Sequence, residues 1–210
     1  MRPLNGGERA RAARAVFLET DRLILRPFTA CDEDVENLFA LDSDPEVMRF
    51  LNNGRPHTRT EIVDKVLPHY LEQTARHRGT YGFWAAIERA SGAFLGWFHF
   101  RPYRHAPEEI ELGYRLMRSA WGKGFATEGS RALIRKGFDE YGVDKIVADT
   151  LVGNVRSRRV MEALGMTLEA EFTLDEYEFP FWDADQRRGV KYALTRDRWQ
   201  AASQRAAGAP

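Results

Sequence analysis

A short segment containing two glycines, Ser119 to Glu128, carries the residue types best suited to binding a phosphate group. It lies between a predicted strand and a predicted helix. Gly122 and Gly124 permit a tight turn, so backbone N–H groups can approach a ligand closely. The first N–H groups of a helix are unpaired and carry a partial positive charge. Together these features favour a pyrophosphate site at the start of the helix.

Two better-known phosphate motifs do not fit this segment. A P-loop would place Ser or Thr after its Gly-Lys pair, whereas Gly122-Lys123 is followed by Gly124. The dinucleotide motif would end on a third glycine, where this chain has Thr127. Two glycines alone are also typical of a plain strand-to-helix turn, so the segment by itself leaves both interpretations open.

The hydrophobic pattern predicts a mixed α/β architecture around this segment. Strands are expected at 18–28, 81–87, 94–100, 109–117, 145–151, 166–174 and 188–194, and helices at 32–41, 44–52, 60–76, 125–141 and 154–164. The helix at 125–141 connects two strands, which predicts one parallel pair inside a mostly antiparallel sheet. Asn154 is expected to cap the helix that follows it, and Gly165 to end that helix.

Length and composition are those of one folded domain. The chain has 210 residues, of which 43% are hydrophobic, and this excludes disorder over the whole length. The Arg-rich start has no apolar run and is not typical of a secretory signal. The end is rich in Ala, Gly and Gln. We therefore expect a disordered tail over 1–16, a single domain over 17–200 and a second disordered tail over 201–210.

Charge and cysteine content disfavour several classes of function. Lys and Arg number 31 and so do Asp and Glu, so no net charge favours nucleic acid or an anionic membrane as a partner. No apolar run approaches the roughly 18 residues needed to span a bilayer. The only cysteine, Cys31, precedes three acidic residues that disfavour a reactive thiolate. The histidines are not spaced with carboxylates as metal ligands are, and no metal is expected.

Three blocks of sequence carry a resemblance to a known family. They are Leu18–Phe28 with Asp44–Met48, Glu111–Tyr114 with Trp121–Glu128, and Asn154–Met166. In these blocks the chain resembles the GNAT superfamily of acyl-CoA-dependent N-acetyltransferases, specifically its RimJ/RimL-like branch, and the resemblance extends from Leu18 to Trp199. The chain departs from the family at Ser119, where Gln or Arg is common, and at Ala163, where Lys is frequent.

The resemblance implies a GNAT-like fold, acetyl-CoA as cosubstrate and no metal. The sheet would be mostly antiparallel, with one splayed parallel strand pair and helices on both faces. The pantetheine arm would enter the gap between the splayed strands and pair with backbone there, and a backbone N–H nearby would stabilise the oxyanion. The residues implied to bind the cofactor are Leu116, Met117, Arg118, Gly122, Lys123, Gly124, Phe125, Ala126, Thr127 and Asn154.

The same resemblance implies direct transfer to an amine, with Glu111 and Ser157 as catalytic residues. Glu111 would take the proton of the amine through a water, although a solvent-facing strand carboxylate is the alternative and Glu109 is a weaker candidate on the same face. Ser157 would give a proton to the departing thiolate, although Ser in a first helical turn is common. Tyr192 is a further hydroxyl that fits the core better.

The expected partners are acetyl-CoA and an amine, which is either a small molecule or a protein N-terminus. Neither nucleic acid nor a membrane is expected as a partner, the chain is expected as a monomer or homodimer, and the cytoplasm is the expected location. The alternative function is a non-catalytic acyl-CoA-binding sensor on the same fold, and a plain interaction module is a second rival. The presence of both Glu111 and Ser157 favours the enzyme.

Overall fold

The structure is a computed structural model, and it describes residues 15–207. The chain forms two compact units, each built from two stretches of sequence. The first unit contains the chain up to Phe100 together with Tyr114–Gly129. The second contains Arg101–Gly113 and the chain from Ser130 onward.

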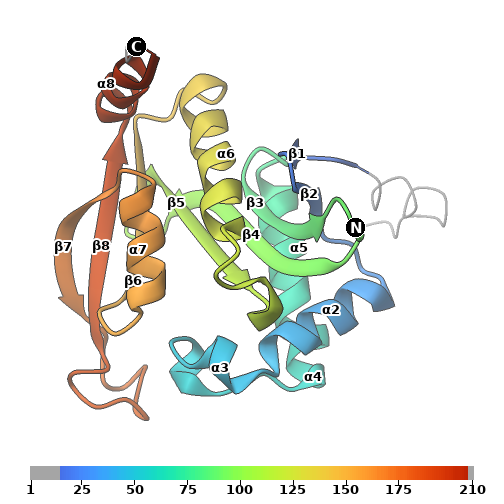
Figure 1. Cartoon of the computed structure of the whole chain (residues 1–210). Helices are drawn as coiled ribbons and strands as arrows, with labels where there is room; N and C mark the ends of the chain where they lie inside the picture. The colour runs from blue at the N-terminus through green and yellow to red at the C-terminus, as the bar shows by residue number, and fades with distance from the viewer. Residues whose placement is uncertain (1–14, 208–210) are drawn as a thin grey trace. The chain divides into compact units, whose positions relative to one another are not determined.

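Eight strands pair in the order β1-β2-β3-β4-β5-β6-β8-β7 (Figure 1). Their bounds are β1 Leu18–Glu19, β2 Leu23–Pro27, β3 Gly82–Glu88, β4 Phe94–Tyr103, β5 Ala106–Leu116, β6 Lys145–Leu151, β7 Thr167–Thr173 and β8 Arg188–Thr195. Strands β5 and β6 run parallel, whereas β1–β2, β2–β3, β3–β4, β6–β8 and β7–β8 are antiparallel pairs. The predicted mixed sheet with one parallel pair is confirmed.

Most helices of the first unit are short, and the two longer ones that lie wholly within it are α2 and α5. The helical segments are α2 Asp32–Asp42, α3 Pro45–Met48, η1 Asn52–Gly54, α4 Arg59–Glu61, η2 Ile62–Val66, α5 Leu67–Arg76 and η3 Arg118–Ala120, followed by the first turns of α6 Phe125–Asp139. Asp44 caps α3, because its side chain accepts a hydrogen bond from the Glu46 N–H at 2.9 Å.

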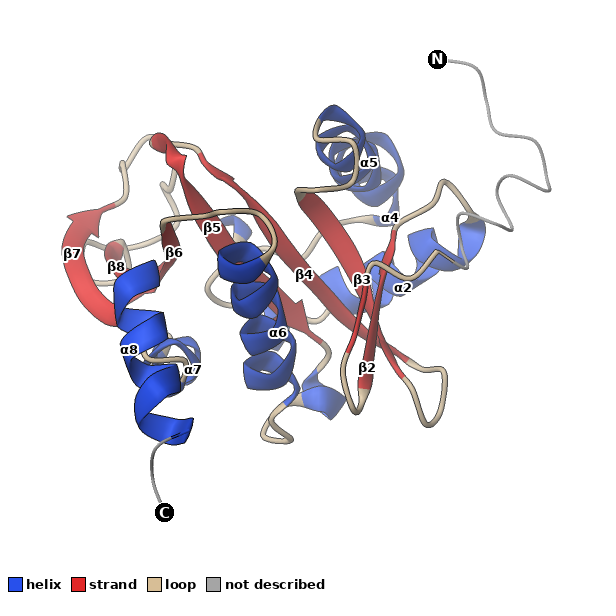
Figure 2. Cartoon of the chain, turned by 90° about the horizontal axis from the view of Figure 1, so that it is seen from above, coloured by secondary structure: helices blue, strands red, loops and turns tan. Residues whose placement is uncertain are grey.

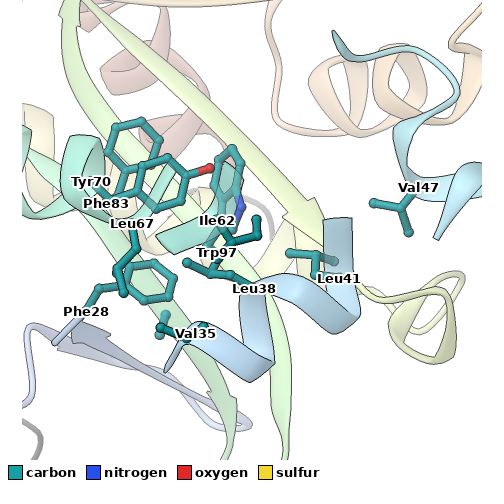
Figure 3. Close-up of a cluster of buried hydrophobic side chains, with 11 residues drawn as sticks. Phe28, Val35, Leu38, Leu41, Val47, Ile62, Leu67, Tyr70, Phe83 and Trp97 are labelled. Carbon is teal, nitrogen blue, oxygen red and sulfur yellow. The ribbon is translucent and has the colours of Figure 1, made fainter. Parts of the chain in front are cut away.

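Helices cover both faces of the sheet in the first unit. On one face, Phe83 and Trp97 pack against Leu38 of α2 and Tyr70 of α5, and the Tyr70 and Phe83 rings stack at 4.0 Å (Figure 3). On the other face, Gly129 of α6 lies so close to Phe98 that an added Cβ would be 2.4 Å from the ring. Figure 2 shows α2 and α5 on one side of these strands and the start of α6 on the other.

In the second unit, the two faces of the sheet differ in what covers them. Its helices after α6 are α7 Val155–Ala163 and α8 Arg196–Ala207. Tyr192 of β8 faces α7, where its hydroxyl donates to Glu162 at 2.9 Å. On the opposite face, Val147 and Ala193 form a small core with Tyr103 and Ala106. Charged side chains surround that small core, as described below.

The strand predicted over 18–28 is interrupted. The chain forms β1, turns, and returns antiparallel as β2, with Leu18 opposite Leu25. The Thr20 hydroxyl accepts a hydrogen bond from the Leu23 N–H at 2.9 Å and so closes this turn. Side-chain bonds of this kind compete with a continuous strand.

The helix predicted over 60–76 is continuous in direction but not in hydrogen bonding. Residues Ile62–Val66 form a π-type turn, in which the Leu67 N–H bonds to the Ile62 carbonyl five residues earlier. Pro68 has no N–H, and its ring crowds the carbonyl four residues before it. The wider turn accommodates Pro68 without ending the helix.

The predicted disordered tail over 201–210 is wrong for residues 201–207, because α8 runs from Arg196 to Ala207. Arg196 fixes the start of this helix by donating to the carbonyls of Phe138 and Val143, both at 2.7 Å. The alanines that follow have the highest helix propensity of any residue. The predicted tail over 1–16 lies almost entirely outside the described residues.

No helix between residues 15 and 207 is both long and apolar enough to cross a membrane.

A buried ion pair ties the end of α2 to the end of β5 inside the first unit. Asp42 is 0% exposed. Its carboxylate binds Arg115 Nη1 at 2.6 Å and His57 Nδ1 at 3.1 Å. Arg115 also lies over the Trp97 ring, 5.0 Å from its centroid. The pair therefore fixes the strand end from which the glycine-containing segment departs.

Replacing Asp42 by Asn should lower the free energy of unfolding by about 3–5 kcal/mol, because the buried charge of Arg115 loses its counterion. Urea unfolding at neutral pH measures the difference. The matched control is Asp64→Asn, since Asp64 is exposed and its replacement should change the free energy by less than about 0.5 kcal/mol. Equal unfolding midpoints for the two variants would contradict the structural role of Asp42.

Candidate functional site

The segment after β5 is held in a fixed path by its own backbone and by Trp121. The Met117 N–H donates to the Leu95 carbonyl at 2.9 Å, and Trp121 Nε1 donates to the Leu116 carbonyl at 2.8 Å. Gly122 and Gly124 then adopt φ values of 72° and 82°. These are left-handed conformations that favour glycine. The sequence-predicted tight turn is therefore present at both glycines.

Six consecutive N–H groups, those of 122–127, donate to no acceptor in the part of the chain that the structure describes. The first backbone bond beyond them is that of the Glu128 N–H to the Gly124 carbonyl, at 3.0 Å. The glycines and Lys123 are exposed, whereas Phe125 is buried and anchors the helix. Exposed, unpaired N–H groups at the start of α6 form an arrangement that can bind an anion.

Arg22 and Glu128 stabilise this turn through hydrogen bonds. Neither of them was assigned a role from the sequence. Arg22 Nη1 donates to the Lys123 carbonyl at 2.9 Å, and its Nε donates to Glu128 at 2.6 Å. Glu128 also accepts from the Thr20 hydroxyl at 2.6 Å and the Arg22 N–H at 3.0 Å. Burial alone would raise the pKa of Glu128, but the hydrogen bonds from Thr20 and Arg22 outweigh it and lower that pKa.

The residues expected to meet the pantetheine arm are placed at the end of β5. Leu116 is buried, Met117 is half-buried, and the Arg118 side chain is exposed with its Nε 3.0 Å from Asp44. The carbonyls of all three residues already accept hydrogen bonds, from Trp121 Nε1, the Ala120 N–H and the Trp121 N–H. Among described residues, the Arg118 N–H has no acceptor. A ligand could therefore bond to that N–H, or to the second lone pair of a carbonyl.

In the second unit, Glu111 lies on the face of the sheet opposite to α7. It pairs in register with Val147 of β6, and its Oε2 is 2.8 Å from Arg101 Nη2. Its side chain is 15% exposed. Glu111 is thus a largely buried carboxylate on the sheet and not a solvent-facing strand residue.

Glu109, the weaker candidate, is occupied by two lysines. Its carboxylate lies 2.7 Å from Lys145 Nζ and 2.6 Å from Lys191 Nζ. Burial opposes ionisation of Glu109, but the two ammonium groups lower its pKa overall. A carboxylate stabilised in its charged form is a poor proton acceptor. Glu111, by comparison, has one cationic neighbour in Arg101.

Asn154 caps α7 as predicted. Its Oδ1 accepts the Ser157 N–H at 3.3 Å. The Nδ2 group of Asn154 donates to no residue in the described chain and can bind a ligand carbonyl. Ser157 is half-buried in the first turn of the same helix.

Tyr192 is a core residue, since it is 3% exposed and its hydroxyl binds Glu162 and Arg158.

Over residues 15–207 there is no group of three or more His, Cys, Asp and Glu side chains that could hold a metal ion. In the first unit, the unpaired backbone N–H groups before α6 offer anion binding. In the second unit, carboxyl and hydroxyl groups offer proton transfer.

Comparisons with known proteins agree with this chemistry. A family described as "Acetyltransferase (GNAT) domain" matches residues 22–167. The chain is 32% identical over 189 residues to the FsC-acetyl coenzyme A-N(2)-transacetylase of Aspergillus fumigatus, covering 87% of this chain and 77% of that protein. It is 30% identical over 164 residues to the uncharacterized N-acetyltransferase YoaA of Bacillus subtilis, covering 78% of this chain and 88% of YoaA.

Solved structures show the same fold. One of them is a ribosomal protein acetyltransferase, RimL, in complex with coenzyme A. It superposes with a TM-score of 0.70 at 18% sequence identity, covering 88% of this chain and 99% of RimL.

Replacing Glu128 by Gln should destabilise the protein by about 2 kcal/mol at pH 7, because charge-assisted hydrogen bonds to Thr20 and Arg22 are weakened. The pKa of Glu128 is lowered by folding, so its stabilisation is complete above its ordinary pKa of about 4.3. It is lost as the pH falls through the lower, folded-state value. Urea unfolding midpoints of the two proteins should therefore converge in acid. The control Glu72→Gln alters an exposed pair with Arg76 and should cost less than about 0.5 kcal/mol; a pH-independent difference for Glu128→Gln would refute this assignment.

Proposed function

We propose that this chain, which belongs to the GNAT family of acetyltransferases, transfers the acetyl group of acetyl-CoA directly to a primary amine. Both substrates are bound together, and no covalent enzyme intermediate forms. The observation that carries the proposal is the row of unpaired N–H groups in the turn before α6. A row of this kind suits the pyrophosphate of acetyl-CoA, and acetyl-CoA is the family's cosubstrate.

The cofactor contacts follow from the polar groups that are available. The N–H groups of 122–127 bind the pyrophosphate, and the exposed Lys123 adds a positive charge beside them. The Arg118 N–H binds the pantetheine arm beside Leu116 and Met117, or the oxyanion that forms at the thioester. In the second unit, Asn154 Nδ2 binds a pantetheine carbonyl. No metal takes part in these contacts.

The chemical step assigns one role to each of two side chains. An amine is mostly protonated at neutral pH and must lose a proton before it attacks. Glu111, which is largely buried on the sheet, accepts that proton through a water. Ser157, close to the Asn154 cap, gives a proton to the departing thiolate.

The acceptor is the amine of a small molecule or of a protein N-terminus. The relative from Aspergillus fumigatus is named for acetyl transfer to an N(2) nitrogen and is similar over 87% of this chain. RimL, a ribosomal protein acetyltransferase, shares 18% identity with this chain. The enzyme acts in the cytoplasm as a monomer or homodimer, without nucleic acid or membrane as a partner.

Release of free thiol from acetyl-CoA tests this function. Purified protein is mixed with acetyl-CoA and a panel of amines: polyamines, aminoglycosides, amino acids and short peptides with varied N-termini. Thiol release with one group confirms the enzyme and identifies its acceptor class. If acetyl-CoA binds but no amine in the panel releases thiol, the sensor function is favoured over the enzyme.

Replacing Gly122 by Ala should weaken binding of acetyl-CoA by about 10-fold or more, because a left-handed turn is strained and the N–H groups lose their alignment. Gly92→Ala is the matched control. Both glycines have a φ of 72°, and an added Cβ would meet no atom within 4 Å at either. Both variants should lose similar stability, about 1 kcal/mol. Calorimetric titration with acetyl-CoA separates them, and equal affinities for the two variants would argue against this turn as the cofactor site.

The double variant Glu111→Gln with Ser157→Ala separates the enzyme from the sensor. Acetyl-CoA should bind with unchanged affinity, whereas thiol release should fall by more than about 10²-fold. Turnover at the wild-type rate would show that the two residue roles are wrong.

A further inference from the structure

We propose that Asp149 is a further catalytic residue, which forms with Glu111 a carboxyl pair that binds the ammonium group of the amine and accepts its proton. This inference rests on the proposed function and extends it to the acceptor end of the site. All the residues that carry it belong to the second unit.

The two carboxylates project from the same face of neighbouring parallel strands. Glu111 of β5 lies opposite Val147 of β6, and Asp149 follows Val147 by two positions. Residues two apart in a strand point to the same face. Glu111 and Asp149 are thus diagonal neighbours on that face, roughly 7–8 Å apart, a gap that a bound ammonium group can bridge with the longer Glu111 side chain.

Asp149 has one oxygen that is bound and one that is not. Its Oδ2 accepts a hydrogen bond from the Tyr103 hydroxyl at 2.8 Å. Its Oδ1 is shielded from solvent and accepts no hydrogen bond within the described chain. A buried acceptor without a donor is unfavourable. An ammonium N–H is a donor of the right charge for that oxygen.

Two cations face Asp149 and partly offset its negative charge, and the nearer is Lys191, its register partner on β8. The Nζ of Lys191 in β8 forms ion pairs with the carboxylates of Glu109 at 2.6 Å and Glu169 at 3.0 Å. It also lies over the Tyr103 ring. Arg104, in the turn after β4, is exposed and acts at longer range. The group in direct contact with Asp149 is thus the neutral hydroxyl of Tyr103.

The Glu111 carboxylate lies in direct contact with a cation, whereas the cationic neighbour of Asp149 is its cross-strand partner Lys191, which itself pairs with two glutamates. Arg101 Nη2 lies 2.8 Å from Glu111 and favours its charged form. Burial raises the pKa of Asp149; its hydrogen bond from Tyr103 opposes that shift, and the charge of Glu111 adds to it. The net shift is upward. Its surroundings therefore favour the protonated form of Asp149, which suits it to hold the proton that the amine gives up.

The step balances in protons and electrons. The ammonium group gives one proton to the pair, where it rests on Asp149, and its freed lone pair attacks the thioester carbon. A C–N bond forms and the C–S bond breaks. The thiolate takes a proton from Ser157, which recovers one from the nitrogen. Products are the amide, the free thiol of coenzyme A and one proton, which Asp149 releases to solvent.

Steady-state rates as a function of pH test the proposal, with the full chain and the amine that supports thiol release. Asp149→Asn should lower kcat/KM by about 10²-fold or more, with acetyl-CoA affinity unchanged. Asp139→Asn is the matched control, since Asp139 is exposed at the end of α6, and it should behave as wild type.

Tyr103→Phe provides a second variant that keeps the proton acceptor. Because the Tyr103 hydrogen bond lowers the pKa of Asp149, its loss should raise that pKa. The acid limb of the kcat/KM profile should then move to higher pH, while activity at the plateau is retained. A residue that only supports the fold would lower the rate at every pH without moving the limb.

Each outcome bears on a separate claim. If the wild type transfers acetyl groups but Asp149→Asn keeps the wild-type rate and profile, the role of Asp149 is overturned and the proposed function stands. An unmoved acid limb in an active Tyr103→Phe enzyme also overturns it. If the wild type releases no thiol with any amine, the proposed function itself fails, and the role of Asp149 fails with it.

Discussion

Six consecutive backbone N–H groups without acceptors are the constraint around which the first unit is organised. They exist because Gly122 and Gly124 take left-handed conformations that turn the chain from β5 into α6. Such a turn must be held by its surroundings. Arg22 and Glu128 brace it, and the buried pair of Asp42 with Arg115 fixes the strand before it. Stability and anion binding in this unit therefore depend on the same contacts.

The second unit arranges carboxylates of unequal character on one face of its sheet. Glu109 is neutralised by two lysines, Glu111 is paired with one arginine, and Asp149 contacts a neutral hydroxyl. Glu109 and Glu111 share a face because they are two positions apart in β5. The register of β5 with β6 places Asp149 on the same face, because Glu111 lies opposite Val147. The three carboxylates on this face thus differ in how closely cations surround them, a difference on which the proposed role of Asp149 rests.

The local signals were readable from the sequence, and the long-range ones were not. Asn154 as a cap and the glycine turn were predictable because their causes lie within a few residues. The bracing of the turn by Arg22 was not, since Arg22 and Glu128 are 106 positions apart. The extension of α8 beyond residue 200 was missed because Arg196 anchors it to carbonyls about 50 positions earlier. Site roles that depend on such contacts, as at Asp149, need the fold.

The central claim is that the N–H groups of 122–127 donate hydrogen bonds to the pyrophosphate of the cofactor. Calorimetric titration of the full chain with coenzyme A and, separately, with pantetheine tests it most directly, since pantetheine keeps the arm and lacks the pyrophosphate. The account predicts that coenzyme A binds at least about 100-fold more tightly, equivalent to about 2.7 kcal/mol. Equal affinities for the two compounds would contradict it, because the turn before α6 would then contribute nothing to cofactor binding.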